Sequence, residues 1–507
     1  MTEPKATRRP FQGWDIATLA VVLALGLLSL PLPIGGDQAL FIVGARQISG
    51  GAVLYKDFWE LNQPGIYLFN LIAGLSFGFN EIGTRLFELL WMVAFSVLAI
   101  QTSKSEFASA WAARAVPVLS IGVFYAVSTP RLLTQKESLV GPVLYLLLWI
   151  LVKRAKSRWW VFAAGVLSSV ILATKILYLP LVLMFWLIAF WDRSVLSVKG
   201  LRRFSADVAV PALLGLLLPI SVLVGYFAYQ GALREFVQTT LVIPPKVVSL
   251  HQNPSTVLIE STQWFLSVWA PLLGLAAFGV LARARELNRF TLGLTGWGLL
   301  GLLIIPIQRT SGWDYHFLVS MIPIGFLAAL GLDSLEVSRQ AGLRRAAIAA
   351  GLVLALSTSA ATLTYKVMLM AKHGLAFSGK SLLEWQGEVY PKYARMVAEV
   401  EFLSEPGLVL DRAYVLGDPR YLYLSGRDQP VPLNGWSPEW FLPEQWDELA
   451  RQIESVRPEH FFVENYNIPL LKKNGKQLEQ VLEDHYSIRK QVEGGIWYEI
   501  NSGPGTH

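Results

Sequence analysis

Long apolar runs are the feature that most constrains the fold of this chain. Stretches of about 18 or more mostly apolar residues, long enough to cross a bilayer as a helix, recur along the first 365 of its 507 residues. Only 16% of the residues are charged, against about 25% in an average soluble domain, and the mean hydropathy is +0.44. These features predict a polytopic α-helical membrane protein.

Hydropathy predicts about eleven membrane-spanning helices. They cover residues 14–34, 83–101, 112–128, 137–152, 159–173, 176–191, 207–229, 263–282, 290–306, 314–332 and 346–365. With this assignment the clusters of Lys and Arg fall in loops on one side of the membrane, which the positive-inside rule makes cytoplasmic. The N-terminus is therefore expected inside and the C-terminus outside. A crossing by residues 64–80, or one long helix over 159–191, would put several of these clusters outside.

The net charge of +6 comes from the same clusters of Lys and Arg in the loops. Because the basic residues lie in short loops between apolar runs, we expect them to orient the chain in the membrane and expect no nucleic-acid partner. The chain has no cysteine, which excludes disulfides and thiol chemistry.

The sequence predicts two domains, a transmembrane module over residues 1–365 and an extracytoplasmic α/β domain over 366–507. The module's outer loop, 35–82, has apolar positions on one helical face at 38–48, as an interfacial helix would. Residues 64–80 are expected to lie in the outer leaflet. In the second domain we expect an amphipathic helix over 381–403, a helix over 443–458, strands at 412–417 and 460–465, and a strand pair turning at 494–495.

Ionisable residues gather near the helix ends of the predicted outer face, where they are costly to keep close to hydrocarbon and so suggest function. They are Asp37, Arg46, Lys56, Asp57, Glu60, Arg85, Arg131, Lys136, Glu137, Lys175, Arg234, Lys246, Arg309, Asp314 and His316. A carboxylate beside cations suits a general base working with a phosphate leaving group. It equally suits a cation site in a secondary transporter or flippase.

A motif set in the same region carries a resemblance to a known family. The string "GGDQALFIVGARQISGGAVLYKDFWELNQPGIYLF" and the following "FGFNEIGTRLFELLW" resemble the first outer loop and second span of GT-C glycosyltransferases. The nearest branch resembles the bacterial relatives of protein O-mannosyltransferases and the lipid A aminoarabinose transferase. The matching elements are Asp37, Tyr55 with Asp57, Pro64 to Tyr67, Gly83 with Arg85, Gln135 with Glu137, Lys175, and His316. Many relatives have a second acidic residue where this chain has Gln38, and Lys-Pro where it has Asn62 and Gln63.

The resemblance implies an enzyme of the cell (plasma or inner) membrane with its active site on the extracytoplasmic side. It would transfer a hexose or pentose from a polyprenyl-phosphate donor, with inversion, to a glycan, lipid or protein acceptor. By the resemblance Asp37 is the general base. The expected substrate-binding residues are Lys56, Asp57, Glu60, Arg131, Glu137, Lys175 and His316. A divalent cation held by Asp37 and Glu137 is left open as a cofactor, and membrane lipids are expected partners.

Structural roles are available for the same residues. Asp37 follows two glycines at a helix start and would suit an N-cap, and Glu137 would suit a pair with Arg131. Lys175 would suit a side chain reaching the headgroups. The transporter or flippase is the alternative function, but it predicts internal repeats and polar residues near mid-span, and the sequence shows no repeat.

Overall fold

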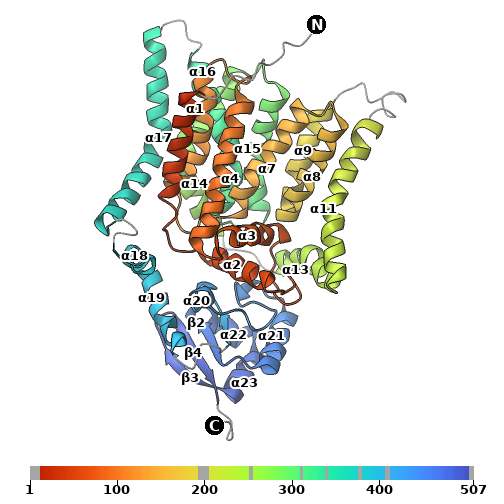
Figure 1. The fold of residues 1–507 in the computed structure, drawn as a ribbon, viewed down its shortest axis with the longest axis vertical. Coiled ribbons are helices and arrows are strands. Elements are labelled where there is room, and N and C mark those ends of the chain that lie inside the picture. Colours follow the sequence, from red (N-terminus) through yellow and green to blue (C-terminus); the bar gives the residue numbers. More distant parts are fainter. Residues whose placement is uncertain are drawn as a thin grey trace.

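The computed structural model describes residues 12–191, 205–250, 255–308, 312–336, 341–374, 379–405 and 412–501. A bundle of long helices forms one end of the molecule and a smaller α/β part forms the other (Figure 1). The bundle helices are α1 (Gly13–Leu27), α4 (Glu81–Ser103), α5 (Ala110–Pro117), α6 (Val123–Val127), α7 (Lys136–Lys153), α8 (Arg158–Thr174), α9 (Leu179–Phe190), α11 (Val210–Tyr229), α14 (Ser255–Ala282), α15 (Arg289–Ile307), α16 (Met321–Glu336) and α17 (Ala341–Lys372). Two short helices, α12 (Leu233–Val237) and α13 (Ile243–Leu250), follow α11.

The described helices support a membrane fold. Six are long and apolar enough to cross a bilayer, and a seventh is added if the two parts of α17, bent by 46°, count as one span. Shorter apolar helices cover Gly13–Leu27, Pro64–Phe77, Arg158–Thr174 and Ile176–Phe190. The predicted break after residue 173 is confirmed, because Lys175 is extended between α8 and α9. The count of eleven spans and their orientation stay predictions.

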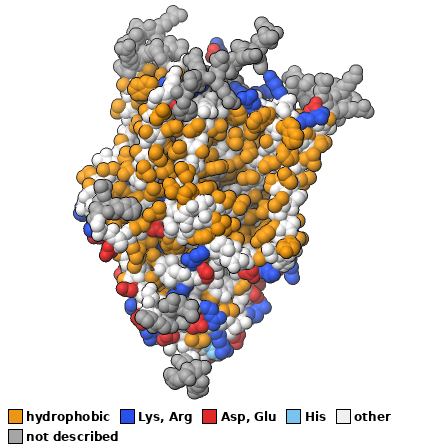
Figure 2. Space-filling model, viewed as in Figure 1, with side chains coloured by type: hydrophobic (Ala, Val, Ile, Leu, Met, Phe, Trp, Pro, Cys, Tyr) orange, Lys and Arg blue, Asp and Glu red, His pale blue; other side chains and the backbone are white. Residues whose placement is uncertain are grey.

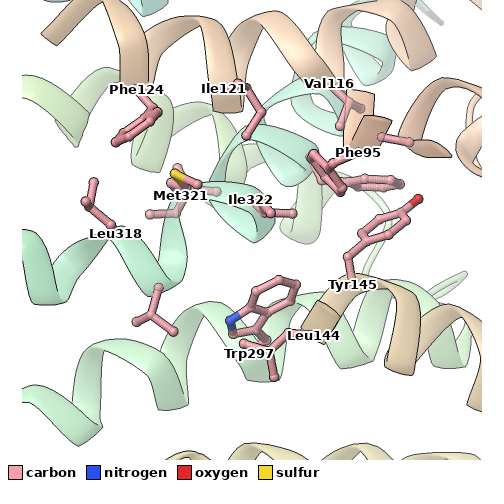
Figure 3. Packing of buried hydrophobic residues seen from close by; sticks show 14 of the residues in the cluster. Phe95, Val116, Ile121, Phe124, Leu144, Tyr145, Trp297, Leu318, Met321 and Ile322 are labelled. Carbon is pink, nitrogen blue, oxygen red and sulfur yellow. The ribbon is translucent and has the colours of Figure 1, made fainter. Parts of the chain in front are cut away.

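Glycines allow some of these helices to cross at very short range. A Cβ on Gly165 of α8 would lie 2.3 Å from the Ala212 carbonyl of α11, and one on Gly215 of α11 would lie 2.1 Å from the Phe162 carbonyl. Close backbone approach through small residues is the usual way that helices associate in lipid. Figure 3 shows the bundle core nearby, where Phe95, Tyr145 and Trp297 pack against Leu144 and Ile322.

Two helices of the predicted outer loop lie across one end of the bundle. α2 (Gly36–Ser49) and α3 (Pro64–Phe77) run between the spanning helices and the α/β part (Figure 1). α2 confirms the helix predicted at 38–48. Figure 2 shows the apolar side chains covering the bundle, with charged side chains gathered over its ends and over the α/β part.

The α/β part follows α17, which passes the predicted domain boundary at 365 and ends at Lys372. Its helices are α18 (Leu382–Val389), α19 (Pro391–Val400), α20 (Arg420–Leu424), α21 (Pro443–Val456), α22 (Ile468–Asn474) and α23 (Lys476–His485). Its strands are β1 (Ala413–Leu416), β2 (His460–Glu464), β3 (Tyr486–Gln491) and β4 (Gly495–Ile500), in the order β1-β2-β4-β3. β1 pairs parallel with β2, and the other two pairings are antiparallel.

The strands predicted at 412–417 and 460–465, the helix at 443–458 and the strand pair turning at 494–495 are confirmed by β1, β2, α21 and the β3–β4 pair. The single helix predicted over 381–403 is wrong. The chain forms α18 and α19 there, with Tyr390 in a non-helical conformation between them. Pro391 explains the break, since proline disfavours a helical conformation in the residue before it and supplies no N–H to continue the first helix.

Candidate active site

Asp37 lies in the first turn of α2, where an acidic side chain interacts favourably with the helix dipole. The N-cap of α2 is Gly35, not Asp37. The Asp37 carboxylate is half-buried and accepts a hydrogen bond at Oδ1 from the indole N–H of Trp436, with a distance of 2.9 Å between the two atoms. The Asp37 charge also interacts with the Tyr315 side chain. Asp37 is thus a carboxylate with one aromatic donor bound to Oδ1.

The start of α2 is fixed by its neighbours Gln38 and Gly35. The Gln38 amide donates to the carbonyls of Pro130 and Leu133, both at 2.5 Å, and its oxygen accepts from the Gly35 N–H at 3.2 Å. A Cβ on Gly35 would lie 3.2 Å from the Pro130 carbonyl, so the loop packs closely on this turn. Buried Arg85 donates to the carbonyl of Pro33 at 2.7 Å and to that of Leu32. These bonds fix the position of Asp37.

Three predicted site residues from different parts of the chain meet in a second polar group. Glu137 is fully buried in the first turn of α7. Its Oε1 lies 2.7 Å from Lys175 Nζ and 2.9 Å from His316 Nδ1, and the Lys175 and His316 nitrogens are 3.3 Å apart. Glu137 Oε2 is also buried and has no hydrogen-bond partner among the described residues.

Tyr315 connects this group to Asp37. It precedes His316, with the two ring centroids 4.5 Å apart, and it interacts electrostatically with both Asp37 and Glu137. Arg131, another predicted site residue, stacks on Trp313 at 4.6 Å and forms an ion pair with Asp314 at 3.3 Å. The Arg131 side chain is 49% exposed. Asp37 therefore has an accessible cation in its surroundings, which a phosphate or a sugar hydroxyl can reach.

Glu60 forms a further part of the site, at the start of α3. Its buried carboxylate accepts from the Asn62 backbone N–H at 2.7 Å and from the Tyr67 hydroxyl at 3.0 Å. Burial raises the pKa of Glu60 above its usual value, against the lowering effect of the Lys136 charge. Lys136 donates to the Asn62 side-chain oxygen and also interacts electrostatically with Glu137, the residue that follows it.

Lys56 and Asp57 are exposed, and their hydrogen bonds lead away from these groups. Lys56 donates to the Gln230 carbonyl at the end of α11, at 3.2 Å. Asp57 accepts from the Val53 N–H at 2.8 Å and closes the local turn. A substrate-binding role for these two residues stays a prediction.

An apolar groove of about 810 Å³ lies among the helices on one side of the bundle. Helices α3, α4, α7, α8 and α11 line it, with Phe69, Trp91, Val143, Val170 and Leu223 among the lining residues. Rim residues such as Leu68 and Val222 are exposed, so the groove opens on the side of the bundle. Lys136 precedes the lining residues Leu139 and Val140 by three and four positions, which places it on the same face of α7. Thr174, another lining residue, directly precedes Lys175.

The described residues include no group of three or more His, Cys, Asp and Glu that could hold a metal ion. The proposed ligand Glu137 has Lys175 at 2.7 Å, so an ammonium group already occupies the position of a counter-ion. The residues present therefore do not fit a divalent cation shared by Asp37 and Glu137.

Comparisons with known proteins assign the fold. No family model and no curated protein matches the sequence. The chain shares its fold with a solved membrane-protein structure, in agreement with the resemblance seen in the motifs. The solved structure that shows this is ArnT from Cupriavidus metallidurans, bound to undecaprenyl phosphate. The two chains are 13% identical, the alignment covers 96% of this chain and 98% of that chain, and the TM-score is 0.61.

Three residues of the site were missed or given no role by the sequence analysis. Lys136 carried a signal, since it is a cation at a helix start on the predicted outer face. Tyr315 was given no role, although it directly precedes the predicted site residue His316. Trp436 carried no signal, because it lies 399 positions from Asp37 and in the other part of the chain.

Proposed function

We propose that this protein transfers a sugar from a polyprenyl-phosphate donor to an acceptor hydroxyl or phosphate, with inversion, at the outer face of the cell membrane. The observation that carries the proposal is the apolar groove, whose lining residues Leu139 and Val140 share a face of α7 with Lys136. Lys136 interacts electrostatically with Glu137, and both Glu137 and Asp37 interact with Tyr315. The fold shared with ArnT, which was solved with undecaprenyl phosphate bound, supports it.

The groove suits the lipid part of such a donor. Its lining is almost wholly apolar, and its exposed rim at Leu68 and Val222 would let a long isoprenoid chain enter from the bilayer. The phosphate would then lie near Lys136, which is half-buried and has no carboxylate in direct contact among the described residues. A cation placed at a developing phosphate charge is a common source of transition-state stabilisation.

The chemistry requires one base and one leaving group. The acceptor oxygen attacks the anomeric carbon from the face opposite the phosphate, and its proton passes to the Asp37 carboxylate. The bond between the anomeric carbon and the phosphate oxygen breaks, and its electron pair leaves with polyprenyl phosphate. Attack from the opposite face accounts for inversion. Arg131, exposed beside Tyr315, is the nearest candidate for binding the acceptor or the sugar.

The buried group around Glu137 is proposed to set the charge of the site. Glu137 balances Lys175, and His316 contacts both. One carboxylate thus compensates a buried cation near the phosphate end of the groove, and Lys136 remains to neutralise the phosphate. This arrangement gives Glu137, Lys175 and His316 a role in positioning the donor.

The test uses purified protein in nanodiscs with a panel of synthetic undecaprenyl-phosphate hexoses and pentoses, radiolabelled in the sugar. Membranes from cells in which the gene is deleted supply the acceptors. We expect label to move from one donor into membrane lipid, glycan or protein. Asp37→Asn should abolish transfer while Tm and binding of undecaprenyl phosphate are retained.

Asp484→Asn is the matched control, since Asp484 is an exposed carboxylate on α23 that accepts a hydrogen bond from the Gln480 amide at 2.9 Å. It should keep wild-type transfer. Substantial transfer by Asp37→Asn would reject the base role. Flux of a labelled lipid-linked sugar across proteoliposomes that survives Asp37→Asn, without transfer, would instead support a transporter or flippase.

A further inference from the structure

We propose that the α/β part supplies a positioning residue to the catalytic site. Residues 427–436, named here the docking segment, seat the indole of Trp436 on Asp37 so that the carboxylate meets the acceptor in one fixed orientation. This inference rests on the proposed function, because it takes Asp37 as the base.

The first half of the docking segment is bound to α2, the helix that carries Asp37. Arg46 donates to the Arg427 carbonyl at 2.6 Å and forms an ion pair with Asp428 at 2.9 Å. Gln47 donates to the Gln429 carbonyl at 2.9 Å. These contacts hold the segment against the C-terminal end of α2, so that its other end can reach the N-terminal turn.

The second half is bound to the loop between α2 and α3. The backbone N–H of Trp59 donates to the Pro432 carbonyl at 2.7 Å, and the side-chain amide of Asn434 donates to the backbone carbonyl of Trp59 at 2.5 Å. These bonds form a short strand-like pairing between the loop and Leu433. The docking segment is therefore fixed at the C-terminal end of α2 and at the loop before it reaches the site.

The turn before Trp436 leaves the indole little freedom. The Asn434 side-chain oxygen accepts from the Trp436 N–H at 2.8 Å. A Cβ on Gly435 would lie 2.0 Å from the Val415 carbonyl of β1, so only glycine lets the chain pass this close to the sheet. A Cβ on Gly36 would lie 3.1 Å from the Trp436 ring, which shows how closely the ring covers the first turn of α2.

The hydrogen bond from Trp436 restricts rotation of the Asp37 carboxylate. The Trp436 N–H occupies Oδ1, so the other oxygen is the one available to an acceptor proton along a fixed direction. Orientation of a reacting group contributes to rate without changing how tightly the donor binds. Removal of the Trp436 N–H is therefore expected to lower kcat and to leave the KM for the donor unchanged.

Trp436→Phe tests this inference, because it keeps an aromatic ring at this position and removes the donor N–H together with part of the indole. The assay is the labelled-sugar transfer described above. We expect kcat to fall by about 10- to 100-fold, which corresponds to the loss of one hydrogen bond to a charged group. The donor KM and the Tm should stay close to the wild-type values.

Trp186→Phe is the matched control. Its indole N–H donates to the Ser168 hydroxyl at 3.0 Å, between α9 and α8 and away from the carboxylate. We expect it to keep kcat within about twofold, as a substitution outside the site should. A Trp436→Phe protein with wild-type kcat would overturn the inference and leave the proposed function standing. Equal losses of kcat, Tm and donor binding would mark a purely structural role and also overturn it. A wild-type protein that transfers no sugar would reject the proposed function and the inference together.

Discussion

Gln38→Glu gives a sharp test of how the site is held. The resemblance places a second acidic residue at this position in many relatives, so the substitution looks conservative by sequence. The structure predicts the opposite. Gln38 is 2% exposed, and its amide nitrogen donates to the carbonyls of Pro130 and Leu133, each at 2.5 Å. A carboxylate has no donor to offer either carbonyl.

The cost follows from these contacts. Each buried carbonyl left without its donor costs about 1–3 kcal/mol, so the two together cost about 2–6 kcal/mol. The proximity of Arg85, whose guanidinium donates to the Gln38 oxygen at 3.3 Å, offsets a part of this. In a chain of this length we expect the Tm to fall by about 2–6 °C. Transfer activity should fall as well, because Gln38 follows Asp37 directly.

Thermal unfolding in nanodiscs, followed by tryptophan fluorescence, measures the effect. Gln47→Glu is the control, since the half-buried Gln47 amide donates only once, to the Gln429 carbonyl, and its loss should cost about 1 kcal/mol. The defect of Gln38→Glu should lessen at low pH, where the protonated carboxyl regains one donor. A Gln38→Glu protein as stable and as active as the wild type would refute the reasoning.

Three further predictions concern the buried ion pair, the groove and the loop carboxylate. Lys175→Ala leaves Glu137 buried without its cation and should destabilise the protein by about 3–5 kcal/mol. Adding Glu137→Gln to this variant should partly restore the Tm. Val222→Trp narrows the groove and should weaken undecaprenyl phosphate binding about tenfold or more. Leu213→Trp, on the same helix but outside the groove lining, should leave this binding unchanged. Equal affinities of the two variants in native mass spectrometry would count against the groove as the lipid-binding site. The raised pKa of Glu60 means that the folded state binds its proton more tightly than the unfolded state. The stability of the wild type relative to Glu60→Gln should therefore decline as pH rises through the folded pKa, and a flat difference in Tm between pH 4 and pH 8 would contradict this.

The sequence predicted most of what depends on local pattern. Apolar runs marked the bundle helices, the break after residue 173 was placed correctly, and the one-sided apolar pattern at 38–48 identified α2. The motif set identified Asp37 as a candidate residue. The fold shared with ArnT agrees with the resemblance that this motif set carries. These signals are local because bilayer length and helix periodicity act over about 20 residues.

Contacts between distant segments could not be predicted in this way. Glu137, Lys175 and His316 were each expected at the site, but their direct contact depends on how three separate elements pack. The break at Tyr390 was missed because the apolar pattern continues on both sides of it. Trp436 was missed because no local pattern links residues 399 positions apart.

The docking segment binds its partners mainly through the polypeptide backbone. The carbonyls of residues 427, 429 and 432 and both backbone groups of Trp59 carry most of the contacts. Backbone groups are the same whatever side chain a position carries. The side chains at 427, 429 and 432 can therefore vary without loss of these contacts, provided that Arg46 and Gln47 on α2 keep their donors.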